Sequence, residues 1–326
     1  MKDVEVTVYC LVYNHEKFLR DCLEGFVNQK TNFRFKVIVH DDASTDNSAE
    51  IIREYAEKYP EIIEPIYQTE NQYSKGVGIV RNFIYPRMEG KYVAICEGDD
   101  FWNDENKLQK QYDALENNPD INFCLCRVCE TNEEGELNGN EYPRNKELVE
   151  AGVIPSEVMV DILVEEGYQF QTSGYFFRIN PYREYIESQE KYKIKSSIGD
   201  VQLILYYIYK GDFYFIDEVL SCYRRTGTNW SSEIVKNSEK RLKMMTELIE
   251  IYKNFNVYSG KKYNKKIEKK INIIKYGYVY YSLEAGLFNK VAGIRYWKYY
   301  DSKKELIYSL MKVYAPKLLK LIGKAD

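Results

Sequence analysis

The chain has 326 residues, of which 44% are hydrophobic and 29% charged, and its net charge at pH 7 is -4. This length and composition exclude a disordered chain and are typical of a globular protein with one large domain and an appendage. No run of about eighteen uncharged apolar residues occurs, and Met1-Lys2-Asp3 leads into a strand pattern without a signal-peptide core, so we expect a cytoplasmic protein.

The first hundred residues alternate strand patterns with helix patterns. Runs such as Val37–Val39 and Tyr92–Ile95 show little polar alternation, which is typical of strands covered on both faces by helices. We therefore predict an α/β fold with a mostly parallel, doubly wound sheet, in which ligands bind beyond the carboxyl ends of the strands. The predicted strands are Val4–Tyr13, Lys36–His40, Ile62–Tyr67 and Tyr92–Cys96, and the predicted helices are Lys17–Gln29, Ser48–Tyr59 and Val77–Met88.

The middle of the chain is less regular. A Gly/Asn/Glu-rich loop is expected over Asn132–Asn145, and from Glu233 onward the pattern is helical with frequent Lys and Tyr. The other predicted elements are helices over Lys107–Asn117, Ser156–Glu165 and Val201–Tyr209 and strands over Ile121–Val128, Ser173–Arg178 and Tyr214–Tyr223.

Acidic residues follow the predicted strands at the places where a doubly wound sheet binds ligands. Asp41-Asp42 follows one strand, Asp99-Asp100 follows another, and Asp200 opens a helix. Any one of these could be a helix N-cap or a turn, since Asp favours both. Three such clusters at the expected edge favour a binding site.

Glu97-Gly98-Asp99-Asp100 is the densest of these clusters. Adjacent carboxylates repel each other unless a cation or several donors offset them, and Mg2+ and Mn2+ prefer carboxylate and phosphate oxygens. A metal ion that joins these acids to a diphosphate would remove the conflict. Gly98 would let the backbone approach a ligand closely, and Phe101-Trp102 would either wall the site or pack below it.

Three segments stand in a distinctive order along the first hundred residues. They are Val6-Thr7-Val8-Tyr9-Cys10-Leu11-Val12-Tyr13-Asn14, then Val37-Ile38-Val39-His40-Asp41-Asp42-Ala43-Ser44-Thr45-Asp46-Asn47-Ser48, then Gly90-Lys91-Tyr92 leading into Glu97-Gly98-Asp99-Asp100. In order and spacing they resemble glycosyltransferase family 2, over roughly residues 4 to 232. The resemblance implies a GT-A fold and a transferase that inverts the anomeric carbon of a nucleotide-sugar donor.

Carried over by position, the resemblance assigns the nucleotide half of the site. It places Leu11 and Tyr13 at the lip of the base pocket and lets Asp42 accept the imide N–H of the nucleobase. Arg81, in Gly78-Ile79-Val80-Arg81-Asn82, matches a family segment that faces the donor. A solvated arginine on a helix surface is the alternative for Arg81.

The resemblance also divides the work of the acidic cluster. Asp99 would hold the ribose, with a place in the metal site, and Asp100 would coordinate Mn2+ or Mg2+ on the diphosphate. Glu97 stands at the first acidic place of the family's D-x-D-like element.

A second constellation is Ser197-Ile198-Gly199-Asp200-Val201-Gln202-Leu203. The family has an acid-Asp pair here, whose Asp is the general base that deprotonates the acceptor hydroxyl. Asp200 is therefore the candidate catalytic base, although a helix N-cap would explain it too. Gly199 departs from the usual acidic neighbour.

A third constellation is Tyr223-Arg224-Arg225-Thr226-Gly227, continuing to Ser232. Relatives commonly show Tyr-Arg-x-His followed by Gly and Trp-Ser in a loop over the diphosphate, and this chain has Thr226 in place of the His. Arg224 and Arg225 would neutralise the leaving pyrophosphate through bidentate contacts. A salt-bridged pair in an ordinary turn is the alternative.

Several other signals are weak. Gln171-Thr172-Ser173-Gly174 stands where the family lines the acceptor side. Seven cysteines in mostly apolar runs favour reduced, buried thiols over a disulfide framework, and Cys124-x-Cys126-x-x-Cys129 lacks a fourth zinc ligand. Neither His15 nor His40 has a Ser or Cys partner that would suggest a hydrolase triad. No dinucleotide-binding or P-loop glycine motif is present.

The last part of the chain is basic. Residues 261–326 contain 16 Lys/Arg and 5 Asp/Glu, a net charge of +11, which leaves -15 for the first 260 residues. Basic residues interleave with Tyr, Ile, Leu and Trp, a pattern of amphipathic helix. We expect this region either to lie in an anionic membrane interface, at the inner face of the cell membrane, or to pack on the catalytic domain or a second subunit; nucleic acid is not an expected partner.

Together these observations predict a catalytic domain over 1–232, with a nucleotide-binding half (1–105) and an acceptor half (106–232), and a basic helical region over 233–326. The expected partners are a nucleotide-sugar donor, which the resemblance implies to be a UDP-sugar, and a glycan or polyprenyl-linked acceptor in surface polysaccharide or glycoconjugate synthesis. The alternatives are a sugar-phosphate nucleotidyltransferase and an inactive nucleotide-sugar-binding module. A nucleotidyltransferase should carry a Gly-rich basic loop after its first strand, and Leu11–Glu16 is not such a loop.

Overall fold

A computed structural model describes residues 3–188, 191–227, 234 and 236–317. The chain divides into two compact units. The first consists of Met1–Gln189 and Leu203–Gly227, and the second of Glu190–Gln202 and Thr228–Asp326. The segment that carries Asp200 therefore groups with the C-terminal helices.

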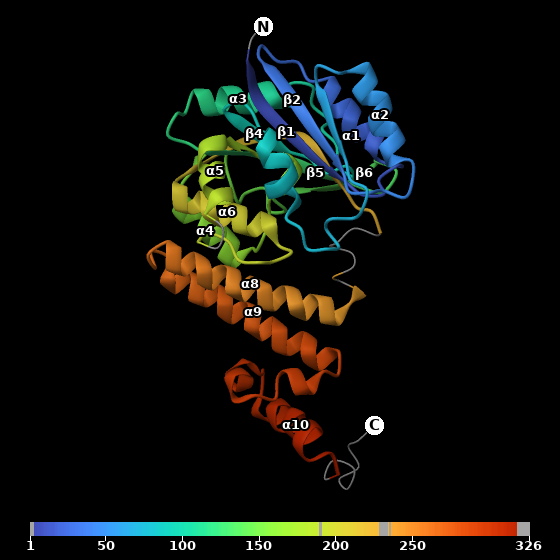
Figure 1. Cartoon of the computed structure of the whole chain (residues 1–326). Helices are drawn as coiled ribbons and strands as arrows, with labels where there is room; N and C mark the ends of the chain where they lie inside the picture. The colour runs from blue at the N-terminus through green and yellow to red at the C-terminus, as the bar shows by residue number, and fades with distance from the viewer. Residues whose placement is uncertain (1–2, 189–190, 228–233, 235, 318–326) are drawn as a thin grey trace. The chain divides into compact units, whose positions relative to one another are not determined.

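The first unit is built on one nine-stranded sheet with the order β3-β2-β1-β4-β8-β5-β9-β7, and β6 pairs with β5 (Figure 1). The strands are β1 (Val4–Val12), β2 (Arg34–Asp41), β3 (Ile63–Tyr67), β4 (Tyr92–Ile95), β5 (Phe123–Thr131), β6 (Leu137–Tyr142), β7 (Gly152–Ile154), β8 (Phe176–Arg178) and β9 (Phe213–Arg224).

Most of these strands run in one direction. β1 pairs in parallel with β2 and β4, β2 with β3, and β5 with β9. β8 lies antiparallel between β4 and β5, so β5 and β9 run the same way as β4. The carboxyl ends of β1, β2, β3, β4, β5 and β9 therefore share one edge of the sheet, which confirms the predicted α/β fold.

Helices cover the sheet because their apolar residues recur at helical spacing. In α1 the buried residues are Leu19, Cys22, Leu23 and Phe26, which form a single stripe. α1 and α2 lie side by side in Figure 1 and contact each other. The helices are α1 (Leu19–Val27), α2 (Ser48–Lys58), α3 (Lys107–Glu116), α4 (Ser156–Glu165), α5 (Ile179–Glu187) and α6 (Gly199–Lys210), whose first four residues group with the second unit.

The structure differs from the predicted elements in several places. Val77–Met88 forms a π-helical turn (Val80–Ile84) and a 3-10 turn (Tyr85–Arg87) in place of an α-helix, in keeping with Gly78 before it and Pro86 within it. The expected loop Asn132–Asn145 contains the strand β6, which is mostly exposed and forms by pairing with β5. Helix α5 follows β8 directly and was not predicted.

The expectation of reduced cysteines was wrong for one pair. Cys129 and Cys222 form a disulfide between β5 and β9, where the strand register places them opposite each other. They are 93 residues apart in the chain, so local spacing gave no sign of their pairing. The other five cysteines are free and buried.

The second unit contains α8 (Ser238–Tyr258), α9 (Asn264–Glu284) and α10 (Lys303–Tyr314), with 3-10 turns at Phe288–Lys290 and Ile294–Tyr299. α8 and α9 lie side by side in Figure 1 and contact each other extensively. One core cluster of this unit consists of Leu242, Tyr278, Val279, Val291, Tyr299 and Tyr300.

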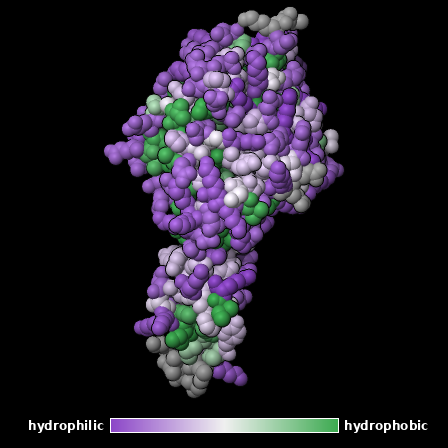
Figure 2. All heavy atoms as spheres, turned by 90° about the vertical axis from the view of Figure 1, so that its left-hand side faces the viewer, coloured by the Kyte–Doolittle hydropathy of each residue, from purple (hydrophilic) through white to green (hydrophobic). Residues whose placement is uncertain are grey.

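Apolar side chains of the second unit also remain at its surface, and Figure 2 shows hydrophobic side chains gathered close to the grey C-terminal end. Ile294, Ile307 and Tyr314 are among the exposed residues of this kind. Within the part of the chain that the structure describes, no helix is long and apolar enough to cross a membrane.

Candidate active site

Hydrogen bonds donated by backbone N–H groups join the candidate residues of four strand ends. The Asp42 N–H donates to the carbonyl of Val12 (2.9 Å), which joins the ends of β2 and β1. The Gly98 N–H donates to the carbonyl of Leu11 (3.0 Å), which joins the acidic segment after β4 to the end of β1. The Arg224 N–H at the end of β9 donates to Asp100 Oδ1 (3.0 Å). Leu11, Asp42, Asp100 and Arg224 therefore belong to one edge of the sheet.

The loops after β1 and β2 hold each other in place. Asn14 has a positive φ of 57°, donates its N–H to Ser44 Oγ (2.9 Å) and accepts the Thr45 N–H at its side chain (2.8 Å). Glu16 makes a similar exchange, because its carboxylate accepts the Asn47 N–H and its own N–H donates to Asp46. Tyr13, beside this pair of loops, is 46% exposed.

Asp42 is a buried carboxylate that organises a further loop. Its Oδ1 accepts the Gln72 N–H (2.8 Å) and its Oδ2 accepts the Tyr73 N–H (3.0 Å). Asn71 donates its side-chain amide to the Asp42 carbonyl. An ionised carboxylate accepts about four hydrogen bonds, so these contacts leave Asp42 the capacity to accept another donor.

The acidic cluster is a tight turn. The Asp100 N–H donates to the Glu97 carbonyl (3.0 Å), with Glu97 exposed and both aspartates buried. A Cβ on Gly98 would lie 2.7 Å from His15 Nδ1 and 3.0 Å from a Val12 methyl. Glycine is thus required by contacts inside the protein, in addition to the ligand approach that the sequence suggested.

Asp99 and Asp100 concentrate negative charge in a poorly hydrated place. Asp99 is 8% exposed and Asp100 3%. Burial raises the pKa of Asp100 well above its ordinary value, and the neighbouring charge of Asp99 raises it further, while the hydrogen bond from the Arg224 N–H opposes both. Among the described residues, no protein group donates a hydrogen bond to the Asp99 carboxylate. A bound cation would therefore stabilise the ionised forms of these two carboxylates.

Arg224 is almost fully buried, at 2% exposure, and clamps the acidic turn. Its Nε donates to the Asp99 carbonyl (3.1 Å), Nη1 to the Glu133 carbonyl (2.9 Å) and Nη2 to Asp21 of α1 (2.6 Å). The guanidinium also lies over the rings of Phe18 and Phe101, about 5 Å from each centroid. The resemblance put this side chain on the diphosphate, but the structure gives its guanidinium protein partners.

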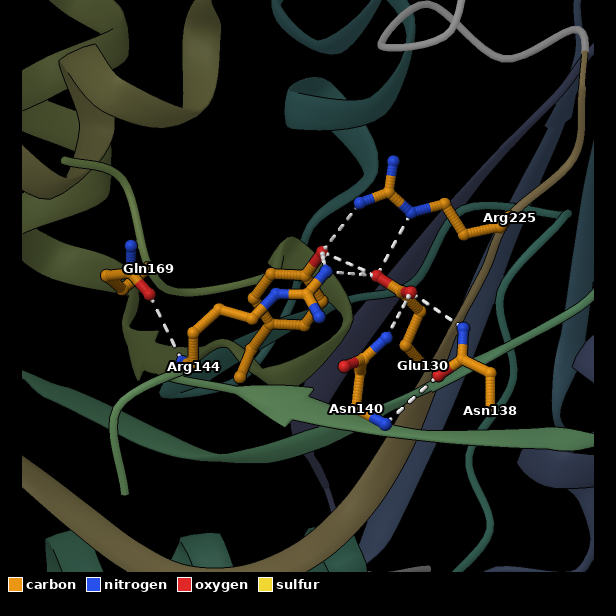
Figure 3. Close-up of polar contacts among 7 residues, drawn as sticks. Glu130, Asn138, Asn140, Arg144, Gln169 and Arg225 are labelled. Atoms are coloured by element: carbon orange, nitrogen blue, oxygen red, sulfur yellow. Dashed lines mark hydrogen bonds and ion pairs between the residues drawn. The ribbon is translucent and has the colours of Figure 1, made fainter. Parts of the chain in front are cut away.

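Arg225 points into a separate polar cluster around Glu130, at the end of β5 (Figure 3). Its Nε lies 3.0 Å from Glu130 Oε2, which also accepts Tyr142 Oη (2.8 Å) and Arg144 Nη2 (2.5 Å). Asn138 and the other amide on β6, Asn140, donate to Oε1. Burial alone would raise the pKa of Glu130, but the hydrogen bonds from Tyr142 and Asn138 and the charged Arg225 outweigh it and lower the pKa to about 2.

The remaining candidates lie outside this set of contacts. Arg81 is exposed on the π-helical turn. Thr226 is buried, at 3% exposure, beside Arg224. Ser173 and Gly174 are buried in a 3-10 turn that receives hydrogen bonds from Trp102 and Gln111, so of the predicted acceptor-side segment only Gln171 and Thr172 are partly exposed. Trp230 and the rest of 228–233 lie outside the described residues.

Asp200 lies in the first turn of α6, in the second unit. Its carboxylate accepts the Val201 N–H (2.8 Å). The phenol of Tyr252 on α8 is buried, which raises its pKa, and the negative charge of Asp200 raises that pKa further. The two side chains are therefore electrostatic neighbours within the second unit.

The acidic pair fits a divalent cation that a ligand helps to hold. Among the described residues, no group of three or more His, Cys, Asp or Glu gathers that could hold a metal ion alone. The buried Asp99 and Asp100 supply oxygen ligands and unrelieved negative charge, so a diphosphate would have to complete the coordination of the ion.

Sequence patterns did not identify three parts of this site. Asp21, the Asn71–Tyr73 loop and Arg144 hold Arg224, Asp42 and Glu130 respectively, and none has a local motif. Glu130 could have been found, because it is the charged residue that ends the apolar run of β5 at the ligand edge.

Comparison with curated proteins gives relatives over the first part of the chain. An uncharacterized protein of Mycobacterium tuberculosis, Rv1520, is 38% identical over 140 residues, which cover 42% of this chain and 39% of that protein. TuaG of Bacillus subtilis, a putative teichuronic acid biosynthesis glycosyltransferase, is 33% identical over 110 residues, 34% of this chain and 41% of its own. The matches thus span about two fifths of the length of these relatives.

Solved structures share the fold over nearly the whole chain. S. aureus TarS 1-349 superposes with a TM-score of 0.59 at 16% identity, covering 98% of this chain and 79% of its own. The mannosyltransferase PcManGT from Pyrobaculum calidifontis, in complex with GDP-Man and Mn2+, has a TM-score of 0.53 at 15% identity, covering 97% and 88%. The family model for glycosyl transferase family 2 matches residues 7–178, slightly more than half of the chain. The chain belongs to glycosyl transferase family 2.

Proposed function

We propose that this glycosyltransferase transfers a sugar from a nucleoside-diphosphate sugar, with a UDP-sugar as the first candidate, to a glycan or lipid-linked acceptor, with inversion at the anomeric carbon. The observation that carries the proposal is that hydrogen bonds from backbone N–H groups join four strand ends at one edge of the sheet, where Asp42, Asp99 and Asp100 are each buried. Such an edge is where doubly wound sheets bind nucleotides.

The donor roles follow the chain's own geometry. Tyr13, exposed beside Leu11, would cover the nucleobase, and Asp42 would use its remaining acceptor capacity for the imide N–H. Asp99, with no protein donor on its carboxylate among the described residues, would accept the ribose hydroxyls. Glu97 and Arg81 are exposed and would contact the donor from the rim.

Asp100, with Asp99 beside it, would hold Mn2+ or Mg2+. When bound, the ion would offset the charge of the departing nucleoside diphosphate. We assign Arg224 to holding the acidic turn, because its guanidinium donates to Asp21, Glu133 and Asp99. Arg225 donates Nε to Glu130.

Asp200 is the proposed general base that takes the proton from the acceptor hydroxyl. Its carboxylate lies in the first turn of α6 and accepts the Val201 N–H.

Thermal unfolding with nucleotides tests the donor site. UDP, GDP, dTDP and CDP should be compared with and without Mn2+, because solved structures with this fold include complexes with UDP-GlcNAc and with GDP-Man. We expect one of them to raise the melting temperature only in the presence of the metal, and Asp100→Asn to abolish that rise. Asp113→Asn, an exposed carboxylate on α3, serves as the matched control. If none of the four stabilises the protein in a metal-dependent way, the donor assignment fails.

The base requires a different variant. Asp200→Asn should abolish sugar transfer and leave metal-dependent nucleotide binding unchanged. Transfer that persists in Asp200→Asn would remove the residue from its role. The same pair of measurements distinguishes an enzyme from an inactive nucleotide-sugar-binding module, since the module would bind nucleotide and transfer nothing even with the native residue.

The acceptor is proposed to belong to a surface polysaccharide or glycoconjugate. Support comes from the similarity to TuaG, a putative teichuronic acid biosynthesis glycosyltransferase, over 34% of this chain. For the C-terminal helices we propose contact with an anionic membrane surface or with a second copy of the chain, because basic and apolar side chains are both exposed there.

A further inference from the structure

Two arginines in the first unit converge on a single carboxylate. Arg144 Nη2 and Arg225 Nε both lie within hydrogen-bonding distance of Glu130 Oε2, at 2.5 and 3.0 Å. Glu130 is 4% exposed and its low pKa keeps it ionised, so this cluster holds two positive charges against one negative charge. The other hydrogen-bond partners of the Glu130 carboxylate are neutral, namely the amides of Asn138 and Asn140 and the phenol of Tyr142.

The surplus charge faces solvent. The side chains of Arg144 and Arg225 are 36% and 44% exposed. Within the part of the chain that the structure describes, Nη1 of each guanidinium donates to no protein acceptor. In Figure 3 the outer nitrogen of Arg225 points away from Glu130. Each arginine therefore uses one edge on Glu130 and keeps another for a ligand.

Both guanidiniums are held in place before any ligand binds. The Arg144 guanidinium lies over the ring of Tyr142, 4.5 Å from its centroid, and the backbone N–H of Arg144 donates to the Gln169 side chain. Arg225 donates its backbone N–H to the Thr131 carbonyl (2.9 Å) and Nη2 of its guanidinium to Tyr142 Oη (3.2 Å). Because these contacts have already restricted the side chains, an anion that binds there loses less entropy by ordering them.

The position of the cluster separates it from the nucleotide half of the site. Arg225 directly follows Arg224, whose N–H binds Asp100. In the sheet, β5 and β9 lie beyond β4 and β8, whereas β1, β2 and β3 lie on the other side of β4. The arginine pair thus adjoins the acidic turn on the side away from Leu11 and Asp42.

From this arrangement we infer that Arg144 and Arg225 form a subsite for an oxyanion, a phosphate or a carboxylate, carried by the acceptor. The assignment to the acceptor rests on the proposed function, because only that function makes the side away from the nucleotide the acceptor side. The oxyanion chemistry rests on the cluster itself. Guanidinium groups bind phosphates and carboxylates through paired, charge-assisted hydrogen bonds. A neutral glycan would leave the surplus charge uncompensated.

Titration of the whole chain with glycerol 3-phosphate, and with glycerol as the neutral match, tests the subsite at constant ionic strength. Melting temperature is the readout, with and without saturating UDP and Mn2+. We expect saturable stabilisation by glycerol 3-phosphate alone, and we expect it to persist when UDP is bound. Arg144→Gln and Arg225→Gln should each weaken binding about tenfold, because hydrogen bonds to charged groups are the stronger kind. Arg53→Gln, an exposed ion-paired arginine on α2, is the matched control.

Glu130→Gln provides a test with the opposite sign. It removes the negative charge and leaves both arginines, so anion affinity should rise, whereas a purely structural cluster would show no gain.

Three results would overturn the inference: no saturable anion effect, an effect unchanged in both arginine variants, or complete loss of the effect when UDP binds. The last would place the arginines on the donor diphosphate. A failure of UDP to bind would contradict the donor proposal and leave the UDP-free titrations to decide the subsite.

Discussion

At the scale of single residues, Arg224 shows how a full charge is kept in a nearly dry place. Three nitrogens of its guanidinium have oxygen acceptors, and its own N–H binds Asp100, so the cation offsets part of the charge of the acidic turn. A buried charge that loses a partner is costly, whereas the complete network is tolerated. The side chain therefore couples the stability of the first unit to the geometry of the donor motif.

Replacing this guanidinium should show the coupling. Arg224→Lys keeps the charge but offers no planar fork for three separate acceptors, so we expect a loss of about 2–4 kcal/mol in the free energy of unfolding and weaker metal-dependent nucleotide binding. Urea denaturation and nucleotide titration measure the two effects. Arg225→Lys, at an exposed position, should cost under about 1 kcal/mol. Equal stability of the two variants would contradict the clamp.

Glu130 predicts a dependence of stability on pH. Its pKa falls from an ordinary value of 4.5 to about 2 in the folded protein. A carboxyl whose pKa is lowered on folding stabilises the protein above its unfolded-state pKa, and this contribution is lost as the pH falls toward the folded-state pKa. At neutral pH the contribution is at most about 3 kcal/mol.

Urea denaturation of the native chain and Glu130→Gln at several pH values measures this effect. The native chain should be the more stable at pH 7, and the difference should shrink by about 1 kcal/mol between pH 6 and pH 3.5. A difference that stays constant over this range would show that Glu130 has no lowered pKa.

The residues of the site could be predicted only where chain order determines their position. Asp42, Asp99 and Asp100 follow apolar strand runs, and parallel strands carry their carboxyl ends to one edge, so their meeting was predictable. The partners of Arg224 were not, because Asp21 is 203 residues away in the chain and lies on a helix without a motif. The sequence alone does not distinguish an arginine that contacts a ligand from one that pairs with a carboxylate of the protein.

At the scale of secondary structure, α1 lies directly against the segment that follows the acidic turn. A Cβ on Gly25 would lie 2.9 Å from the Trp102 carbonyl oxygen and 3.0 Å from its nitrogen, both backbone atoms. Phe26 of the same helix packs edge-on against the Trp102 ring, with centroids 4.7 Å apart. Helix α1 therefore sets the position of the chain just after Asp100.

Gly25→Ala tests this contact. Alanine is the better helix former by about 1 kcal/mol, so without a clash the variant would be more stable. We expect instead a loss of about 1–3 kcal/mol, with reduced nucleotide binding, because the backbone of Trp102 has to move. Gly78→Ala, where the nearest atoms to a Cβ lie 3.8 and 3.9 Å away, is the control. A stabilised Gly25→Ala would show that the helix is free to shift.

Elements with a strong apolar pattern were predicted well, whereas the polar strand β6 was not. α4 occupies the predicted Ser156–Glu165, and β4 and β9 lie within one residue of their predicted bounds. β6 escaped prediction because its residues are polar and exposed, and it exists through its pairing with β5 and the amide contacts of Asn138 and Asn140 to Glu130. Neither the strand pairing nor these amide contacts can be read from the local amino-acid composition.

At the scale of the whole molecule, the chain combines two chemically distinct units. The acidic first unit holds the proposed donor and oxyanion sites, and the second carries Asp200 together with the basic C-terminal helices. α10 begins at an N-cap, Ser302, whose hydroxyl accepts the Glu305 N–H, and it exposes Lys303, Lys304 and Ile307. Exposed basic and apolar groups on one helix suit an anionic, partly apolar surface.

Co-sedimentation of the full chain with lipid vesicles distinguishes a membrane surface from a second subunit. We expect binding to vesicles that contain phosphatidylglycerol, little binding to pure phosphatidylcholine, and a loss of binding at high salt. Each basic residue near such a surface contributes about 1 kcal/mol, so replacing Lys303, Lys304 and Lys317 by Gln should weaken binding roughly a hundredfold. Lys30, Lys58 and Lys75, exposed in the first unit, are the control set for the same substitutions. If the chain binds neither kind of vesicle but forms a dimer that Ile307→Ser dissociates, the C-terminal helices bind a second copy of the chain. Such a dimer should depend little on salt, because an apolar contact is stabilised by side-chain burial.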